Sequence, residues 1–211
     1  MKWFKNRRYA NPGPGRYKQL LAAQSKFKRR RERITGVPMF NRIAISIDTG
    51  NKPNSWNDPT GITVWGYSLR PRRFVLIFAV NRWLAFPKLV KVTKSLHRQF
   101  RSWNRGPVPL LIEDKGSGTS LIQTLESETY IKIIKVQPVA SKTVRMEEVT
   151  VVMEREEVWL PAEGETADLV NTEYIQFPFG GADNLCDSTS QFLSWIGIPK
   201  YRRSAGTIYF K

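Results

Sequence analysis

Three groups of acidic residues in this chain have the types and positions needed to bind divalent cations. Asp48 follows one apolar run, and the pair Glu113 and Asp114 follows another. Asp183 and Asp187 stand one helical turn apart, so both side chains can face the same way. Clustered carboxylates repel one another, and Mg²⁺ or Mn²⁺, which prefer oxygen ligands, relieve that repulsion. Two such ions ~3.5–4 Å apart can activate water and stabilise the leaving oxygen in phosphodiester cleavage.

Each acid also has an ordinary structural explanation. Asp48 fits a turn residue, and Asp183 fits a helix N-cap, where Asp is favoured. Glu113 and Asp114 fit a solvated strand end. Other catalytic chemistry has little support. The single histidine, His97, falls in the middle of an expected helix, and the chain has no Gly-Lys-Ser or Gly-Lys-Thr phosphate-binding loop.

The elements that would carry these acids follow from the hydrophobic periodicity. Apolar runs and alternation predict strands, and apolar residues at helical spacing predict helices. The expected strands are 42–48, 61–69, 73–80, 108–113 and 130–136. The expected helices are 87–103, 119–126, 143–154, 165–174 and one starting near residue 183.

The order of these elements predicts an α/β fold. Three consecutive strands with short turns predict an antiparallel meander, and the later strand-helix-strand crossovers predict parallel strands. The result is a mixed central sheet flanked by helices. Sites in open α/β sheets commonly form at the carboxyl ends of strands, so we expect Asp48 and Glu113 to meet there.

Positive charge is concentrated at the start of the chain. The net charge is +16, and residues 1–35 hold twelve Lys or Arg and one acid, Glu32. Residues 36–211 hold 22 basic and 17 acidic residues, for a net charge of +5. Such an excess indicates a polyanionic partner, either nucleic acid or an acidic membrane surface. The alternative for residues 1–38 is a solvated, disordered or partly helical arm.

The cysteine content and the lack of long apolar runs limit the class of protein. The one cysteine, Cys186, excludes an intrachain disulfide and disfavours a cysteine zinc site. No run of 18 apolar residues exists, and no apolar segment follows the basic start as in a secretory signal. We therefore expect no membrane span and a reducing compartment.

Five ordered segments resemble the nuclease domain of the large terminase subunit of tailed phages, from about residue 38 to 197. The segments are 44–58 (Ala-Ile-Ser-Ile-Asp-Thr-Gly-Asn-Lys through Asn-Asp), 110–125 (Leu-Leu-Ile-Glu-Asp-Lys-Gly-Ser-Gly and onward), 142–146 (Lys-Thr-Val-Arg-Met), 158–161 (Val-Trp-Leu-Pro) and 177–191 (Phe-Pro through Asp-Asn-Leu-Cys-Asp-Ser).

The resemblance implies an RNase H-like fold and a DNA endonuclease that uses two Mg²⁺ or Mn²⁺ ions to cut concatemeric viral DNA during packaging. Carried over by position, the first metal ligand is Asp48, the second is Glu113 with Asp114 beside it, and the third is Asp183. Asp187 and Asp58 are supporting candidates, and Lys142 and Arg145 match basic positions of the third segment. Arg29, Arg30 and Arg31 are the candidate DNA-binding cluster of the arm.

The resemblance also implies a setting. The expected domains are the arm 1–38, a nuclease domain 39–200 and a tail 201–211. The expected partner is double-stranded DNA, with the small terminase subunit, the portal and a separate ATPase chain as further candidates. The expected location is the cytoplasm of a bacterial host carrying a phage or prophage.

Two departures from the family pattern keep alternatives open. Asn184 stands where the family has a second adjacent acid, so a second metal is expected to bind more weakly. The roughly 40 residues before the core hold no ATPase motif. The alternatives are an inactive DNA-binding remnant of a prophage terminase, or a resolvase or recombinase with the same fold.

Deleting residues 1–35 should lower the affinity for DNA and flatten its dependence on salt, because each phosphate contact releases counterions. Binding to a labelled duplex across a salt series measures both quantities. Unchanged binding would exclude a DNA role for the arm.

Overall fold

A computed structural model describes residues 7–9, 40–50, 59–103, 106–138, 140–181, 183–197 and 207–210. Within these residues no helix has the length and apolar character needed to cross a membrane. The elements in chain order are β1 (Arg7–Tyr9), β2 (Arg42–Asp48), β3 (Thr60–Leu69), β4 (Arg72–Arg82), α3 (Phe86–Arg101), β5 (Leu110–Glu113), α4 (Ser117–Glu128), β6 (Ile133–Pro138), α5 (Lys142–Glu154), β7 (Val158–Pro161), α6 (Glu165–Gln176), α7 (Asn184–Gly197) and β8 (Thr207–Phe210).

The strands form one mixed sheet in the order β1-β7-β4-β3-β2-β5-β6-β8. The pairs β2–β3 and β3–β4 are antiparallel and make the expected meander. The other pairs are parallel: β2–β5, β5–β6, β6–β8, β4–β7 and β1–β7. The predicted α/β fold with a mixed sheet is confirmed.

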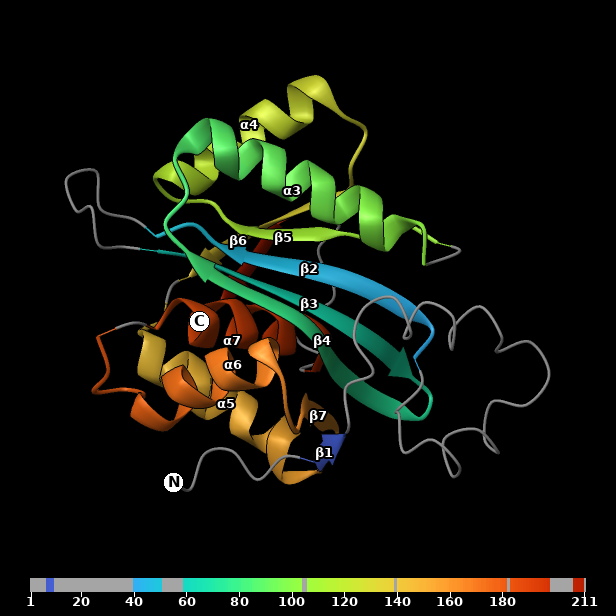
Figure 1. Ribbon diagram of the computed structural model, residues 1–211, viewed down its shortest axis with the longest axis vertical. Helices are drawn as coiled ribbons and strands as arrows, with labels where there is room; N and C mark the ends of the chain where they lie inside the picture. The colour runs from blue at the N-terminus through green and yellow to red at the C-terminus, as the bar shows by residue number, and fades with distance from the viewer. Residues whose placement is uncertain are drawn as a thin grey trace.

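Helices cover both faces of this sheet. Figure 1 shows α3 and α4 on one side of it and α5, α6 and α7 on the other. Each side has its own apolar core. Leu89, Leu96 and Phe100 belong to the α3/α4 core, while Met146, Val170 and Phe192 belong to the core under α5, α6 and α7. A sheet covered in this way is buried on both faces, which explains why β2 is buried from Ile43 onward.

Two short strands lie outside both the elements that periodicity predicted and the segments of the resemblance. Arg7–Tyr9, within the expected arm, pairs with β7, and Thr207–Phe210, within the expected tail, pairs with β6. Both add to the edges of the sheet. Runs of three or four residues carry too little periodicity to separate a strand from a loop.

The alternation of side chains along β2 and β5 sets the site. Ile43, Ile45 and Ile47 point into the α3/α4 core, so Ala44, Ser46 and Asp48 point toward α5, α6 and α7. On β5, Leu110 and Ile112 point to α3 and α4, so Leu111 and Glu113 point the other way. Asp48 and Glu113 therefore face the same helices.

Substituting Phe192 by Ala should lower the free energy of unfolding by about 3–5 kcal/mol. Its ring is fully buried and stacks on Trp65, with ring centroids 4.9 Å apart. Phe179→Ala is the matched control, because that ring is 96% exposed and its loss should cost less than about 0.5 kcal/mol. Urea unfolding measures both, and equal effects would contradict the assignment of the core.

Candidate active site

Asp48 and Glu113 lie side by side at the carboxyl edge of the sheet. Strands β2 and β5 are parallel, and Ile47 is paired with Ile112, so each acid comes one residue beyond that pair. Gly118, in the first turn of α4, is pressed against this strand end. A Cβ at that position would lie 1.9 Å from the carbonyl oxygen of Glu113, so the close approach requires glycine.

Asp114 points away from Glu113, as strand alternation requires. Its Oδ1 accepts a hydrogen bond from Thr119 Oγ1 at 2.8 Å, and its Oδ2 accepts one from Gln137 Nε2 at 3.4 Å. Its backbone N–H donates to the carbonyl of Val136 at 2.8 Å. Of the two adjacent candidate ligands, only Glu113 joins the other acids.

Helix α7 brings two more acids over the same strands. Asp183 directly precedes this helix, and the N–H of Asp187 donates to the carbonyl of Asp183 at 2.8 Å. Asp187 is buried, whereas the Asp183 side chain is 36% exposed. Asn184, which stands where the family pattern expects a second acid, is buried. Its backbone carbonyl oxygen would lie 2.4 Å from a Cβ on Gly61, so α7 packs closely against β3 at this point.

Polar side chains of α7 attach it to the centre of the sheet. Gln191 Nε2 donates to Ser46 Oγ at 2.9 Å and to the carbonyl of Ile47 at 3.5 Å. Ser188 Oγ donates to the carbonyl of Ser46 at 2.9 Å and shares a hydrogen bond of 2.6 Å with Thr63 Oγ1. These bonds hold Asp187 above the end of β2.

Two cations from α5 lie among the four acids. Lys142 Nζ is 2.7 Å from Asp183 Oδ1 and 2.8 Å from Asp187 Oδ2. Arg145 Nη2 donates to Asp187 Oδ1 at 2.8 Å, and its Nη1 lies 3.8 Å from Glu113 Oε2. Asp187 is thus shared by both cations, and Arg145, which is itself buried, connects it to Glu113.

The proton equilibria of these groups show how closely they interact. Burial raises the pKa of Asp48 well above its ordinary value, and the charges of Asp187 and Glu113 raise it further. Burial also raises the pKa of Glu113 and of Asp187, while Arg145 opposes the rise in both. Although burial lowers the pKa of Lys142, the charges of Asp187 and Asp183 and the hydrogen bonds to them together outweigh it, and that ammonium stays protonated.

The donor chemistry of this cluster fits a hard divalent cation. Its ligands would be carboxylate oxygens, and the repulsion that raises the pKa of Asp48 is the kind that Mg²⁺ or Mn²⁺ relieves. Within the described residues, the side chains are not arranged so that three or more His, Cys, Asp or Glu could bind one metal ion. Lys142 and Arg145 instead pair with these carboxylates, so a metal would compete with them.

Glu173 of α6 is a buried acid that contacts the start of α7. Its Oε1 accepts a hydrogen bond from the N–H of Cys186 at 2.8 Å, and its Oε2 accepts one from Asn81 Nδ2 at 2.8 Å. Burial raises its pKa to about 7, against the effect of the backbone donors Cys186 and Leu185. Glu173 therefore caps the first turn of the helix that presents Asp187.

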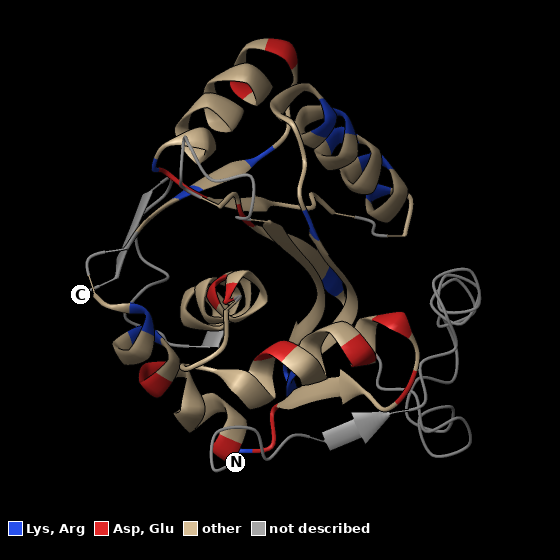
Figure 2. Ribbon diagram, turned by 60° about the vertical axis from the view of Figure 1, so that its left-hand side comes forward, with Lys and Arg blue, Asp and Glu red and all other residues tan. Residues whose placement is uncertain are grey.

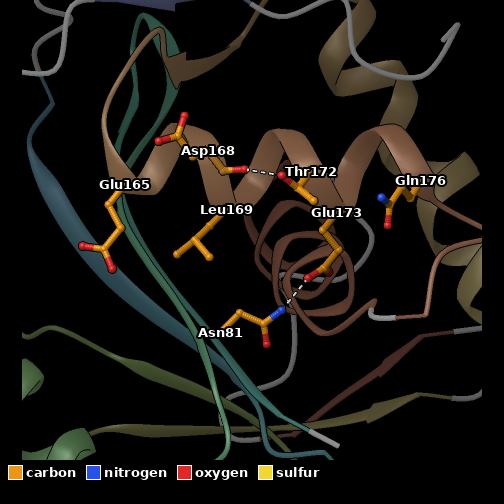
Figure 3. A pocket seen from close by; sticks show the side chains of 7 residues that line it. All are labelled: Asn81, Glu165, Asp168, Leu169, Thr172, Glu173 and Gln176. Carbon is orange, nitrogen blue, oxygen red and sulfur yellow. Dashed lines mark hydrogen bonds between the residues drawn. The ribbon is translucent and has the colours of Figure 1, made fainter. Parts of the chain in front are cut away.

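A cavity of about 450 Å³ opens beside Glu173. Figure 3 shows its lining, in which Asn81 comes from β4 and the other residues come from α6. They are Asn81, Glu165, Asp168, Leu169, Thr172, Glu173 and Gln176. Asn81 and Glu173 bond to each other, so the cavity reaches the carboxylate cluster only indirectly. We place the candidate chemistry at the cluster rather than in this cavity.

Two of the predicted site groups lie outside the described residues, namely Asp58 and the cluster Arg29, Arg30 and Arg31. The sequence reasoning also missed Glu173, Gln191 and Ser46. Glu173 had a usable signal, since it falls on the buried stripe of α6 between Val170 and Tyr174. An acid on the apolar face of a helix indicates a buried polar contact.

Comparison with solved structures identifies the fold. The large terminase nuclease of thermophilic phage G20c with bound magnesium aligns with a TM-score of 0.54 at 15% identity, over 71% of this chain and 79% of that one. Its cobalt-bound form aligns with a TM-score of 0.53. The P22 large terminase nuclease domain aligns with a TM-score of 0.53 at 14% identity, over 74% of this chain and 81% of that one. The expected RNase H-like fold of terminase nuclease domains is therefore confirmed.

The likeness is confined to structure. No protein-family model matches the sequence, and a search of curated proteins finds no match. At 14–15% identity the comparison establishes the fold, and the role of each residue has to be argued from its own surroundings.

Glu173→Gln should remove one component of the dependence of stability on pH. Because the folded-state pKa of Glu173 is raised from 4.5 to about 7, its stabilising contribution is complete below about 4.5 and is lost as the pH rises through 7. The free energy of unfolding of the wild type minus that of the variant should therefore fall by at most about 3 kcal/mol across this window. Urea unfolding of both proteins at several pH values measures this difference. The contributions of Asp48, Glu113 and Asp187 are present in both proteins and so largely cancel when one value is subtracted from the other. A difference that does not change with pH would contradict the assigned role.

Proposed function

We propose that this protein is a metal-dependent DNA endonuclease of the large-terminase type. The observation that carries the proposal is the convergence of Asp48, Glu113 and Asp187 on the α7 side of the sheet, where the charge of Asp187 raises the pKa of both Asp48 and Glu113. The fold supports it, because the G20c and P22 domains with this fold are nucleases. The magnesium and cobalt bound to the G20c domain support a divalent cofactor here.

The acids and the two cations of this cluster have different proposed roles. Asp48, Glu113, Asp183 and Asp187 would hold one or two Mg²⁺ or Mn²⁺ ions. Bound there, the ions would activate water and stabilise the leaving oxygen of a phosphodiester. Lys142 and Arg145 neutralise the acids in the absence of metal. Lys142 is half exposed and stays protonated, so its ammonium can turn from Asp183 toward a DNA phosphate.

Cleavage of supercoiled plasmid in Mn²⁺ tests the proposal. The wild type should nick and linearise the plasmid, and EDTA should stop the reaction. Asp48→Ala should abolish cleavage, because it removes one of the carboxylates that would hold the metal. Asp114→Asn is the matched control. It alters an adjacent acid that bonds to Thr119 and Gln137, so most of the activity should remain.

Each alternative has its own outcome. DNA binding without cleavage by the wild type would favour the inactive remnant. Equal cleavage by the wild type and Asp48→Ala would assign the activity to a contaminant. Selective cleavage of four-way junctions over linear duplex would favour a resolvase.

A further inference from the structure

The exposed side of α3 is basic. The helix carries five Lys or Arg and no acid: Lys88, Lys91, Lys94, Arg98 and Arg101. Its buried side packs into the core through Leu89, Leu96 and Phe100. Lys88, Lys91 and Arg98 are exposed and recur at intervals of three and seven residues, so they line the same outer side of the helix. Lys94 forms an ion pair with Glu128 of α4.

Helix α6, on the opposite side of the sheet, has the opposite charge. Helix α6 carries three acids, Glu165, Asp168 and Glu173, and neither Lys nor Arg. Figure 2 shows the contrast, with blue along α3 above the sheet and red along α6 below it. A polyanion that approaches this domain is therefore attracted to α3 and repelled from α6.

The basic face begins at the edge of the sheet where the acids lie. Asp48 pairs with Gly61, and the neighbouring Thr60 pairs with Arg82 at the end of β4. Helix α3 starts four residues later, at Phe86. Two strand spacings, about 10 Å, separate β4 from β2. Lys88 therefore lies at the same edge of the sheet as the carboxylate cluster, although across the sheet from it, and Arg101 lies toward the opposite edge.

We infer that Lys88, Lys91 and Arg98 of α3 form a docking face for the phosphate backbone of duplex DNA, which leads the duplex to the carboxylate cluster. The inference rests on the proposed nuclease function and adds the path of the substrate. Lys88 and Arg98 are ten residues apart, which is about 15 Å along a helix. Phosphates of one DNA strand recur every ~3.4 Å of duplex axis, so the face spans roughly four of them.

Binding to a fluorescent blunt duplex in EDTA, across a KCl series, tests the inference without any cleavage. The triple variant Lys88→Gln, Lys91→Gln, Arg98→Gln should reduce the slope of log affinity against log salt by about 2.7, or about 0.9 for each lost contact. Its affinity near 0.1 M salt should fall at least ~10-fold. An unchanged slope would overturn the inference, as would a wild type that does not bind the duplex.

The matched control removes the same charge elsewhere. Arg42, Arg70 and Arg155 are exposed, and they lie at the start of β2, after β3 and after α5, toward the other edge of the sheet. The triple variant Arg42→Gln, Arg70→Gln, Arg155→Gln should keep most of the affinity. An equal loss in both triple variants would mean that only net charge matters, and would reject a defined face.

A cleavage probe attached to the protein locates the duplex. Cys186 is buried, so an iron chelate that reacts with thiols will label an introduced cysteine selectively. Ser95→Cys places the probe in the middle of the α3 face, and Thr172→Cys places it on α6, with both positions exposed. Radical cleavage of bound DNA from position 95 but not from 172 supports the inference, and the reverse pattern overturns it. If the wild type binds DNA in this way yet does not cut it in Mn²⁺, the proposed function fails while the docking face stands.

Discussion

Burying several carboxylates together is the constraint on which the rest of this structure depends. Desolvation and mutual repulsion raise the pKa of Asp48, Glu113 and Asp187, and an ion without a partner in such a place costs several kcal/mol. Helix α5 meets that cost with Lys142 and Arg145, which are three residues apart and so lie on one side of the helix. The same acids that need these cations are suited to bind a metal, so neutralisation within the protein and metal binding compete for the same oxygens.

That balance depends on the position of α7, which is held by two different kinds of contact. Toward the carboxyl edge of the sheet the contacts are polar, through Ser188 and Gln191 to β2 and β3. Further along the helix they are apolar, and Phe192 stacks on Trp65. Hydrogen bonds fix direction and distance, whereas apolar packing supplies most of the stability. The acid-bearing end of α7 is thus the end with the most directional contacts.

The distribution of charge gives the domain a polarity that the chain's net charge of +16 does not describe. The buried acids lie on the α7 side of the sheet, α6 is acidic, and the basic residues of α3 lie across the sheet. Because the field of a protein is the sum of such local groups, a negatively charged partner experiences two different faces.

Much of the fold was predictable because it rests on local periodicity. The meander and the helices α3 to α7 follow from apolar spacing, and strand alternation alone implied that only one of Glu113 and Asp114 could face the other acids. The sequence also indicated which acids to consider. Three features depended on contacts between distant segments: the bridging of Asp183 and Asp187 by Lys142, the cap from Glu173 to Cys186, and the addition of β1 and β8 to the sheet. Periodicity records which side of an element is apolar, but the residue that a side chain meets across the core depends on register and packing, which no local pattern encodes.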